Sequence, residues 1–317
     1  MTRAHHTGCP GIRCVAVVPN WNGRPLLERH LPSILSALPH EKLIVVDNGS
    51  TDDSVELLKN TFADVEVIAR AENGGFSVAV NEGIRRAGSC DLLIVLNNDV
   101  EVAPGFLDSI LPLFEDEDVF AVSPRILLPA RHGLDEGPTT GFWHHGMFYT
   151  GQRQQVQEVT PILYATGCAA VYRRSMLDEL GGFDEVYSPF YWEDADLGYR
   201  AWKRGWKTLY QPASEVIHQH AASISKMDPV FTGRIKARNG LFFIWRNIED
   251  KRMLAAHRRW LPLVAVRRRL AGDKAFVSGL IEATRRRAEM AEARTRDSVF
   301  RRLSDCEIFD TLGIRHR

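Results

Sequence analysis

The chain has 317 residues and equal numbers of basic and acidic side chains, so its formal net charge is zero. This length allows one large α/β domain with an appendage, and the composition is that of an ordinary soluble globular protein. A zero net charge gives no indication of a nucleic-acid partner, and we expect none. The average conceals a division, because the segment from Lys251 onward holds 17 Lys/Arg against 8 Asp/Glu, while the rest holds 23 against 32.

The cysteines and the apolar runs indicate the cellular compartment of the protein. Five cysteines, without CxxC spacing, argue against a disulfide framework or a zinc site and favour a reducing cytoplasm. The N-terminus lacks the apolar core of a signal peptide, and no apolar run approaches the ~20 residues of a membrane-spanning helix. We therefore expect a cytoplasmic protein, at most peripheral at the inner face of a membrane.

Short apolar runs alternate with amphipathic stretches through the first 125 residues. The apolar runs predict buried strands at 14–18, 43–46, 65–68, 92–96 and 120–122. The stretches between them predict helices at about 24–37, 52–60 and 76–87. Strands that alternate with helices of this length indicate parallel βαβ units with right-handed crossovers.

The pattern breaks down from about 126 to 160, which predicts a variable loop or a short antiparallel excursion. Its histidines, His132, His144 and His145, match no ordinary metal spacing, so a polar surface loop is the favoured interpretation. Further on, regular patterns predict strands at 165–172, 207–210 and 215–218, helices at 174–180 and 193–204, and a mostly helical region beyond 228. Gly181 is expected to end its helix as a glycine C-cap.

Asp99 and His218 each end a strand-like run. A carboxylate at the tip of a buried strand projects into the crevice beyond the sheet edge. A hard cation such as Mg²⁺ or Mn²⁺ often joins such a carboxylate to substrate phosphates, and an imidazole is a suitable further ligand for Mn²⁺. The two residues together suggest one metal-bound diphosphate, to which Glu101 is a further candidate ligand.

Two strand-to-helix turns are candidates for nucleotide contact. Asp47 ends a strand and is placed to accept hydrogen bonds from a nucleobase, but a purely structural Asx-turn role is an equal alternative. The loop from Asn73 to Gly75 enters the next helix through two glycines, and such a helix N-terminus favours an anion. Neither GxGxxG nor GxxxxGK[ST] occurs, which weakens dehydrogenase and kinase-like interpretations.

Glu193 and Asp194 open a helical pattern. Acidic residues are common at helix starts because they complement the helix dipole, and this structural explanation is favoured over a catalytic one for any single pair. The functional alternative is a carboxylate that faces a cleft and takes a proton from an acceptor hydroxyl. The preceding aromatic residues 190–192 suit a wall for a sugar ring and suit a core equally well.

In their order along the chain, these segments resemble the inverting glycosyltransferases of family 2 over roughly residues 13–225. The resemblance implies the GT-A fold, an α/β architecture with a Rossmann-like, mostly parallel sheet flanked by helices, here with a helical C-terminal extension. It rests on segments 18–22, 46–52, 73–81, 97–99, 181–185 and 192–197, and on His218 followed by Ser223. The metal motif reads Asn97-Asn98-Asp99, in the form carried by rhamnosyltransferase-like members, and therefore offers one carboxylate.

The resemblance assigns roles to named residues. Contact with the nucleotide-sugar falls to Pro19, Asn20, Trp21, Asn22, Asp47, Asn73, Gly75, Asn81, Asn98 and Asp99. The divalent metal, Mn²⁺ or Mg²⁺, falls to Asp99 and His218. Catalysis falls to Asp194 as general base with Glu193 in support, and acceptor contact falls to Trp192, Glu193 and Gly167.

The function implied is transfer of a sugar, with inversion, from a nucleotide-diphosphate donor to a hydroxyl group. dTDP-rhamnose is the preferred donor, and the acceptor is a glycan, a lipid-linked glycan or a small molecule. A nucleotidyltransferase and a catalytically silent glycan- or membrane-binding module on the same fold are the alternatives. A nucleotidyltransferase is expected to have a Gly-rich, Lys-containing loop after the first strand, and this chain lacks that loop.

We predict an N-terminal tail at 1–12, a catalytic domain at 13–225 and a basic helical extension at 226–317. The catalytic domain divides into a nucleotide-binding half at about 13–125 and an acceptor half at about 126–225. In the extension, residues 258–269 place an apolar core between two arginine clusters. Packing on the catalytic domain is slightly favoured, while peripheral attachment to an anionic membrane stays open. The apolar surface of these helices also suits a homodimer.

Overall fold

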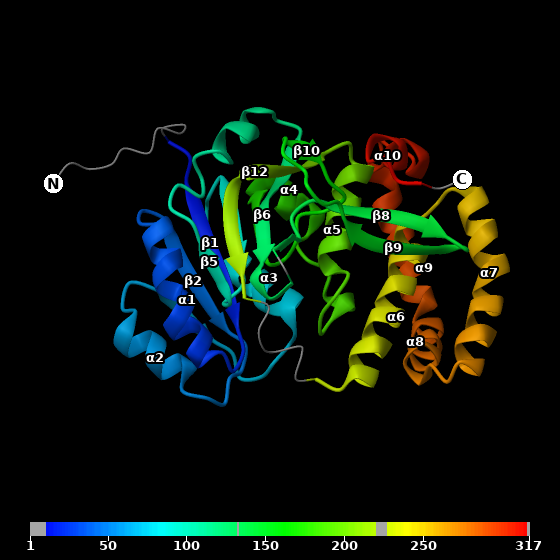
Figure 1. Ribbon diagram of the computed structural model, residues 1–317, viewed down its shortest axis with the longest axis horizontal. Helices are drawn as coiled ribbons and strands as arrows, with labels where there is room; N and C mark the ends of the chain where they lie inside the picture. Colours follow the sequence, from blue (N-terminus) through cyan, green and yellow to red (C-terminus); the bar gives the residue numbers. More distant parts are fainter. Residues whose placement is uncertain (1–10, 132, 220–226, 316–317) are drawn as a thin grey trace.

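The computed structural model describes residues 11–131, 133–219 and 227–315. Its centre is a mixed sheet with the strand order β10-β12-β6-β11-β4-β1-β2-β3. Figure 1 shows the N-terminal part of this sheet toward the left of the molecule and the C-terminal helices at the right. Most of the expected N-terminal tail, His132, Ser223 and the boundary near 225 lie outside the described residues.

The first half of the sheet forms as the alternating pattern predicts. Its four strands pair in parallel in the order β3-β2-β1-β4. They are β1 (Cys14–Asn20), β2 (Lys42–Asp47), β3 (Glu66–Ala69) and β4 (Leu92–Leu96). The helices between them are α1 (Arg24–Ala37), α2 (Ser54–Thr61) and α3 (Phe76–Arg86).

The second half makes the sheet mixed rather than mostly parallel. β11 (Ala169–Arg173) runs antiparallel between β4 and β6 (Val119–Leu128), and β12 (Lys207–His218) is parallel to β6. The two strands expected near 207 and 215 are this one long strand, whose register with β6 shifts. Smaller elements are β5 (Val100–Val102), η1 (Leu111–Glu115), η2 (Pro129–Arg131), β7 (Leu134–Asp135) and β10 (Thr160–Pro161).

The segment without clear periodicity contains an antiparallel hairpin, β8 (Thr139–His144) and β9 (Met147–Gln152). After β11 come α4 (Arg174–Leu180), η3 (Glu185–Tyr187) and α5 (Glu193–Lys203). Gly181 ends α4 in the left-handed conformation with φ of 75°, which confirms the expected glycine C-cap.

The C-terminal region is helical, as expected. Its elements are α6 (Pro229–Asn247), α7 (Lys251–Leu270), α8 (Lys274–Arg285), α9 (Arg287–Asp297), η4 (Ser298–Phe300) and α10 (Asp305–Thr311). Among the described residues, no helix is both long enough and apolar enough to cross a membrane.

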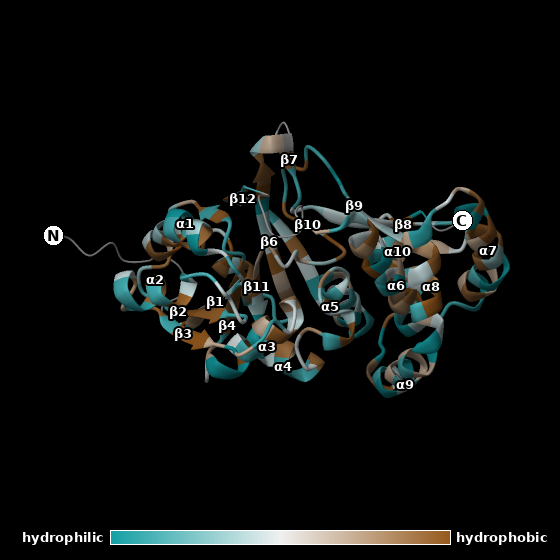
Figure 2. Cartoon of the chain, turned by 90° about the horizontal axis from the view of Figure 1, so that it is seen from below, coloured by the Kyte–Doolittle hydropathy of each residue, from teal (hydrophilic) through white to brown (hydrophobic). Residues whose placement is uncertain are grey.

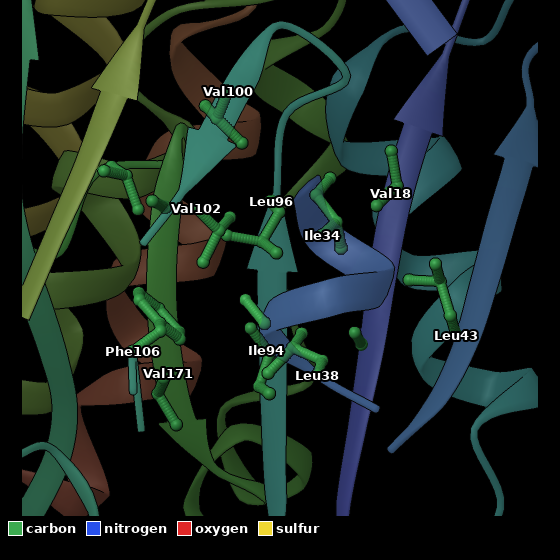
Figure 3. Close-up of a cluster of buried hydrophobic side chains, with 14 of the residues drawn as sticks. Val18, Ile34, Leu38, Leu43, Ile94, Leu96, Val100, Val102, Phe106 and Val171 are labelled. Atoms are coloured by element: carbon green, nitrogen blue, oxygen red, sulfur yellow. The ribbon is translucent and has the colours of Figure 1, made fainter. Parts of the chain in front are cut away.

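Buried side chains hold the sheet between helical layers. On one face, α1 packs against residues of β1 and β4 such as Val18 and Leu96, as Figure 3 shows. The opposite face packs against α3, α4 and α5. A third cluster joins α5 and the β8–β9 hairpin to α6, α8, α9 and α10. Figure 2 shows the hydrophobic strands inside largely hydrophilic outer helix surfaces. This arrangement fixes α5, and with it Glu193 and Asp194, between the sheet and the C-terminal helices.

Candidate active site

The carboxyl ends of the parallel strands meet in a polar network. Asn20 at the end of β1 donates to Asp47 Oδ2 at 2.9 Å and accepts from Asn98 Nδ2 at 2.7 Å. Ser50 donates to both oxygens of Asp47, from its backbone N–H and its hydroxyl group. Because Asp47 is only 1% exposed, the structure shows a turn-forming role for it. Contact between Asp47 and a base stays a prediction.

The neighbouring turns interlock with this network. The Asn48 side chain donates to Asn73 Oδ1 and to the Gly75 carbonyl group, and it accepts from the Gly74 N–H. Asn22 Oδ1 accepts the Thr51 N–H at 2.7 Å. Hydrogen bonds therefore join the segment 20–22, the turn 47–51 and the loop 73–75 into one polar network, and its contact with a nucleotide stays a prediction.

Asn81 lies in α3 and is fully engaged elsewhere. Its amide nitrogen donates to the Phe183 carbonyl group at 2.8 Å and to Glu185 Oε1, and its oxygen accepts the Phe183 N–H. It thus joins the nucleotide half to the segment after α4. The geometry favours this structural role over the nucleotide contact that the sequence suggested, which remains untested.

Asp99 and His218 do meet. His218 Nε2 lies 3.3 Å from Asp99 Oδ1, and both side chains are largely buried. Glu136, which follows β7, lies 3.1 Å from His218 Nδ1 on the other side of the ring. Burial opposes the charged imidazole, yet the pKa of His218 is raised by the neighbouring Cys168 and by Asp99 and Glu136, which accept its N–H groups.

This donor set fits a divalent cation. One carboxylate oxygen and one imidazole nitrogen at this separation can contact a single ion, and Glu136 can orient the ring from behind. Within the described part of the chain, no group of three or more His, Cys, Asp or Glu residues forms a ready metal cluster. A diphosphate and water would therefore have to complete the coordination.

Glu193 and Asp194 occupy the first turn of α5. The Gly167 N–H donates to Asp194 Oδ2 at 3.3 Å, and the Ala195 N–H donates to Oδ1 at 2.7 Å. Glu193 is 7% exposed, and its Oε2 is buried with no hydrogen-bond partner among the described residues. A buried carboxylate oxygen without a donor is costly, which favours the protonated form of Glu193.

The surroundings favour the protonated form of both acids. Burial raises the pKa of Asp194 to about 6, although the backbone N–H groups of Gly167 and Ala195 act in the opposite direction. Burial and the neighbouring Asp194 raise the pKa of Glu193 well above its usual value. A carboxyl group with a pKa near 6 is ionised at neutral pH and is still basic enough to accept a proton.

The backbone of residues 167–168 connects the two groups of side chains. Gly167 contacts Asp194, and the carbonyl group of Cys168 accepts the Asn97 N–H at 2.8 Å. The Cys168 thiol also lies beside His218. The candidate metal ligands and the candidate base therefore stand on either side of a two-residue segment of backbone.

The aromatic wall is partly core. The indole ring of Trp192 lies 5.2 Å from the ring of Phe243, centroid to centroid, and Phe190 is buried. The exposed rings of His144 and His145 lie 3.8 Å apart and tilted by 43° at the β8–β9 turn, and the His145 ring lies against Trp260 of α7. This arrangement agrees with the surface-loop interpretation of these two histidines.

Glu136, Ser50 and Cys168 were missed by sequence reasoning. Ser50 stands in the turn that also holds Asp47, and its hydroxyl group was a detectable signal there. Glu136 lies in the segment without periodicity, where no sequence pattern distinguishes it.

Comparisons with known proteins identify the family. The family model described as "Glycosyl transferase family 2" matches residues 15–181. The chain is 32% identical over 243 residues to an N-acetylglucosaminyl-diphospho-decaprenol L-rhamnosyltransferase of Mycobacterium tuberculosis, covering 67% of this chain and 78% of that protein. It is 29% identical to the O-antigen chain rhamnosyltransferase WbaN of Salmonella anatum, covering 56% of each.

Solved structures show the same fold. A mannosyltransferase of Pyrobaculum calidifontis in complex with GDP-Man and Mn²⁺ aligns with a TM-score of 0.53 at 17% identity, covering 92% of this chain and 82% of that one. GalNAc-T7 with UDP, GalNAc and Mn²⁺ aligns with a TM-score of 0.60 at 19% identity, covering 76% of this chain and 48% of that one. The GT-A fold expected from the sequence is confirmed, and the chain belongs to glycosyl transferase family 2.

Proposed function

We propose that this chain is a metal-dependent inverting glycosyltransferase that moves L-rhamnose from dTDP-rhamnose to a hydroxyl group of a lipid-linked glycan. One observation carries the proposal: the backbone of residues 167–168 contacts Asp194 through the Gly167 N–H, and it contacts the segment 97–99 through the Cys168 carbonyl group, which accepts the Asn97 N–H. A single displacement needs the site of the leaving diphosphate and the site of the attacking hydroxyl group to lie close together.

In the proposed mechanism, the nucleotide binds at the polar network formed at the ends of β1, β2 and β4. Asp194 accepts the proton of the acceptor hydroxyl group, whose oxygen attacks the anomeric carbon as the bond to the diphosphate breaks. The pair formed by Gly167 and Ala195 holds the Asp194 carboxylate in place. Glu193, in the same first turn of α5, supports Asp194 and contributes to acceptor contact.

Asp99 and His218 are the residues that would hold the divalent cation. The bound ion supplies positive charge that stabilises the departing diphosphate. Glu136 fixes the orientation of the His218 ring, since it accepts from Nδ1 and leaves Nε2 directed toward Asp99.

Donor choice and metal dependence can be tested by calorimetric titration with dTDP-rhamnose, UDP-N-acetylglucosamine and GDP-mannose, each with and without Mn²⁺. We expect the tightest binding for dTDP-rhamnose, and we expect it only with the ion. The variant His218→Ala should lose the effect of Mn²⁺, whereas the variant His257→Ala, altered at a buried histidine that bonds to Trp245, should keep it. Equal binding of all donors, or binding unaffected by Mn²⁺, would contradict these assignments.

The acceptor is proposed from the relatives and from the surface of α7. The Mycobacterium tuberculosis relative is named for a decaprenol-linked substrate. α7 carries seven Lys/Arg and no Asp/Glu in its 20 residues. Its exposed apolar side chains follow one helix face, since Leu263, Val266 and Leu270 are 57%, 58% and 84% exposed. Such a face suits an anionic membrane surface that presents a lipid-linked acceptor.

Flotation with vesicles tests this membrane contact. We expect binding to phosphatidylglycerol-containing vesicles and little to pure phosphatidylcholine, because each basic residue near the surface adds about 1 kcal/mol. The double variant Val266→Glu, Leu270→Glu should lose binding. The control Val299→Glu changes a residue that is 77% exposed on η4, outside α7. Equal binding of both vesicle types would contradict the proposal.

A further inference from the structure

The segment before Glu193 has an unusual backbone. Tyr191 and Trp192 both have positive φ angles, 72° and 79°, in a region that side-chain-bearing residues rarely adopt. Trp192 is also the N-cap of α5, and its carbonyl group accepts the first helical hydrogen bond, from the Asp196 N–H at 2.8 Å. The conformation of these two residues therefore sets where α5 begins and where Asp194 stands. Such a turn persists only if its surroundings hold it.

A side chain of the C-terminal region holds this turn. Asn239 of α6 is fully buried, and its amide nitrogen donates to the carbonyl groups of Tyr187, Phe190 and Tyr191 at 2.7, 3.1 and 2.8 Å. Its oxygen accepts from Arg238 Nε at 2.8 Å, which fixes the orientation of the amide group.

Neighbours of Asn239 support the same segment. The Arg238 guanidinium group donates to the Ser188 carbonyl group and is itself paired with Glu282 of α8 at 2.6 Å. Gly240 lies directly under the indole ring of Trp192, where a Cβ atom would come within 3.1 Å of the ring. Three consecutive residues of α6 therefore contact the segment from residue 187 to residue 192.

The same segment also contacts the loop and the helix start that are proposed to bind the nucleotide. The Pro189 carbonyl group accepts the Phe76 N–H at 2.9 Å, and the Ser188 hydroxyl group donates to the Gly74 carbonyl group at 3.3 Å. Residues 187–192 thus lie between the loop proposed to bind the donor and the carboxylate proposed to act as base.

We propose that Asn239 is a positioning residue, whose amide group holds the left-handed turn at Tyr191 and Trp192 and thereby fixes Asp194 against the acceptor. The proposal rests on the proposed role of Asp194 as base. It makes α6 part of the catalytic apparatus, although this helix belongs to the C-terminal extension in the sequence.

The test compares Asn239→Leu, which keeps the branched side-chain shape but removes the N–H groups, with Ile244→Ala. Ile244 is a fully buried α6 residue whose side chain cannot form hydrogen bonds, so its truncation lowers stability without removing those that Asn239 makes. We expect Asn239→Leu to lower kcat about 10²-fold, as displacement of a reacting group does, with the dissociation constant of the donor changed less than about twofold. Ile244→Ala should keep kcat within about threefold at a temperature where both variants are folded.

Hydrogen exchange without substrate gives an independent readout. We expect the amide N–H groups of residues 190–196 to exchange faster in Asn239→Leu than in Ile244→Ala, when the two have equal melting temperatures. If Asn239→Leu does not fold, Gly240→Ala, which displaces the indole ring of Trp192, should lower kcat and loosen the same amides.

Two results would overturn the inference: kcat and exchange in Asn239→Leu equal to those of Ile244→Ala, or, if that variant does not fold, wild-type kcat and exchange in Gly240→Ala. An inactive wild-type protein would instead contradict the proposed function, and the exchange comparison would still decide whether Asn239 holds the turn.

Discussion

Asp194 has two properties that oppose each other, because a base must be ionised and the surroundings of this carboxyl group favour its protonated form. Its pKa of about 6 means that the ionised fraction falls as the pH is lowered through that value. We therefore expect kcat to fall about tenfold for each pH unit below 6 and to level off above 7.

The variant Asp194→Asn should lose about 10²–10⁴-fold in kcat, the contribution of general base catalysis. The measurement is initial rate against pH for the two proteins at saturating donor. Activity of Asp194→Asn within tenfold of wild type, or a wild-type profile flat from pH 5 to 8, would show that another group accepts the proton.

The same two acids should make folding stability depend on pH. A carboxyl group whose pKa is raised in the folded protein favours folding at low pH, and this contribution is lost as the pH rises through the folded value. The double variant Glu193→Gln, Asp194→Asn removes both groups. We expect its melting temperature, relative to wild type, to rise between pH 4 and pH 8. A constant difference across this range would contradict the raised pKa values.

The positions of the candidate site residues in the fold were predictable where sequence order carried information. Asp99, His218 and Asp194 end or begin recognisable elements, and the structure brings the first two within 3.3 Å. Glu136 was not predictable, because its contact with His218 spans 82 positions of the chain and no pattern surrounds it. The hydrogen bonds of Asn81 to Phe183, 102 positions away, could not be inferred from sequence for the same reason.

At the scale of elements, α3 shows how closely a helix approaches the sheet. Gly83 faces the side chains of Val17 and Val46, and a Cβ atom there would lie 2.3 Å from Val17. We expect Gly83→Val to destabilise the protein by about 1–3 kcal/mol through overpacking, measured by urea unfolding. The control Gly88→Val changes a glycine with no neighbour within 4 Å, although its φ of 68° adds backbone strain. A smaller loss for Gly83→Val than for this control would contradict the packing argument.

Element types followed from periodicity more reliably than their pairing did. The helix predicted at 24–37 agrees with α1 at both ends, because Pro25 and the apolar spacing mark it clearly. The antiparallel direction of β11 could not be derived, since its run of buried residues resembles that of a parallel strand. The sequence does not distinguish the hairpin β8–β9 from a variable loop, because glycines and histidines interrupt its pattern.

In the whole molecule, the C-terminal helices share buried contacts with α5, which packs on the sheet. Tyr199 of α5 donates to Asp305 at 2.6 Å, and Asn247 of α6 donates to Asp196 at 2.7 Å. The hydrophobic cluster around Tyr199 also includes residues of α6, α8, α9 and α10.

We therefore expect one cooperative transition in calorimetry and in urea, with matching midpoints by fluorescence and circular dichroism. A chain ending at residue 227 should lack this transition, because it exposes that cluster. Two separate transitions in the full chain would show that the extension folds on its own.

The proposed reaction is inverting transfer of rhamnose with Asp194 as base. The most direct measurement is nuclear magnetic resonance of the product formed from dTDP-rhamnose and a short-chain N-acetylglucosaminyl-diphospho-polyprenol with Mn²⁺, for wild type and Asp194→Asn. We expect a rhamnosyl product from the wild-type protein, with the anomeric configuration opposite to that of the donor, and almost none from the variant. A product with retained configuration, or equal yields from both proteins, would contradict it.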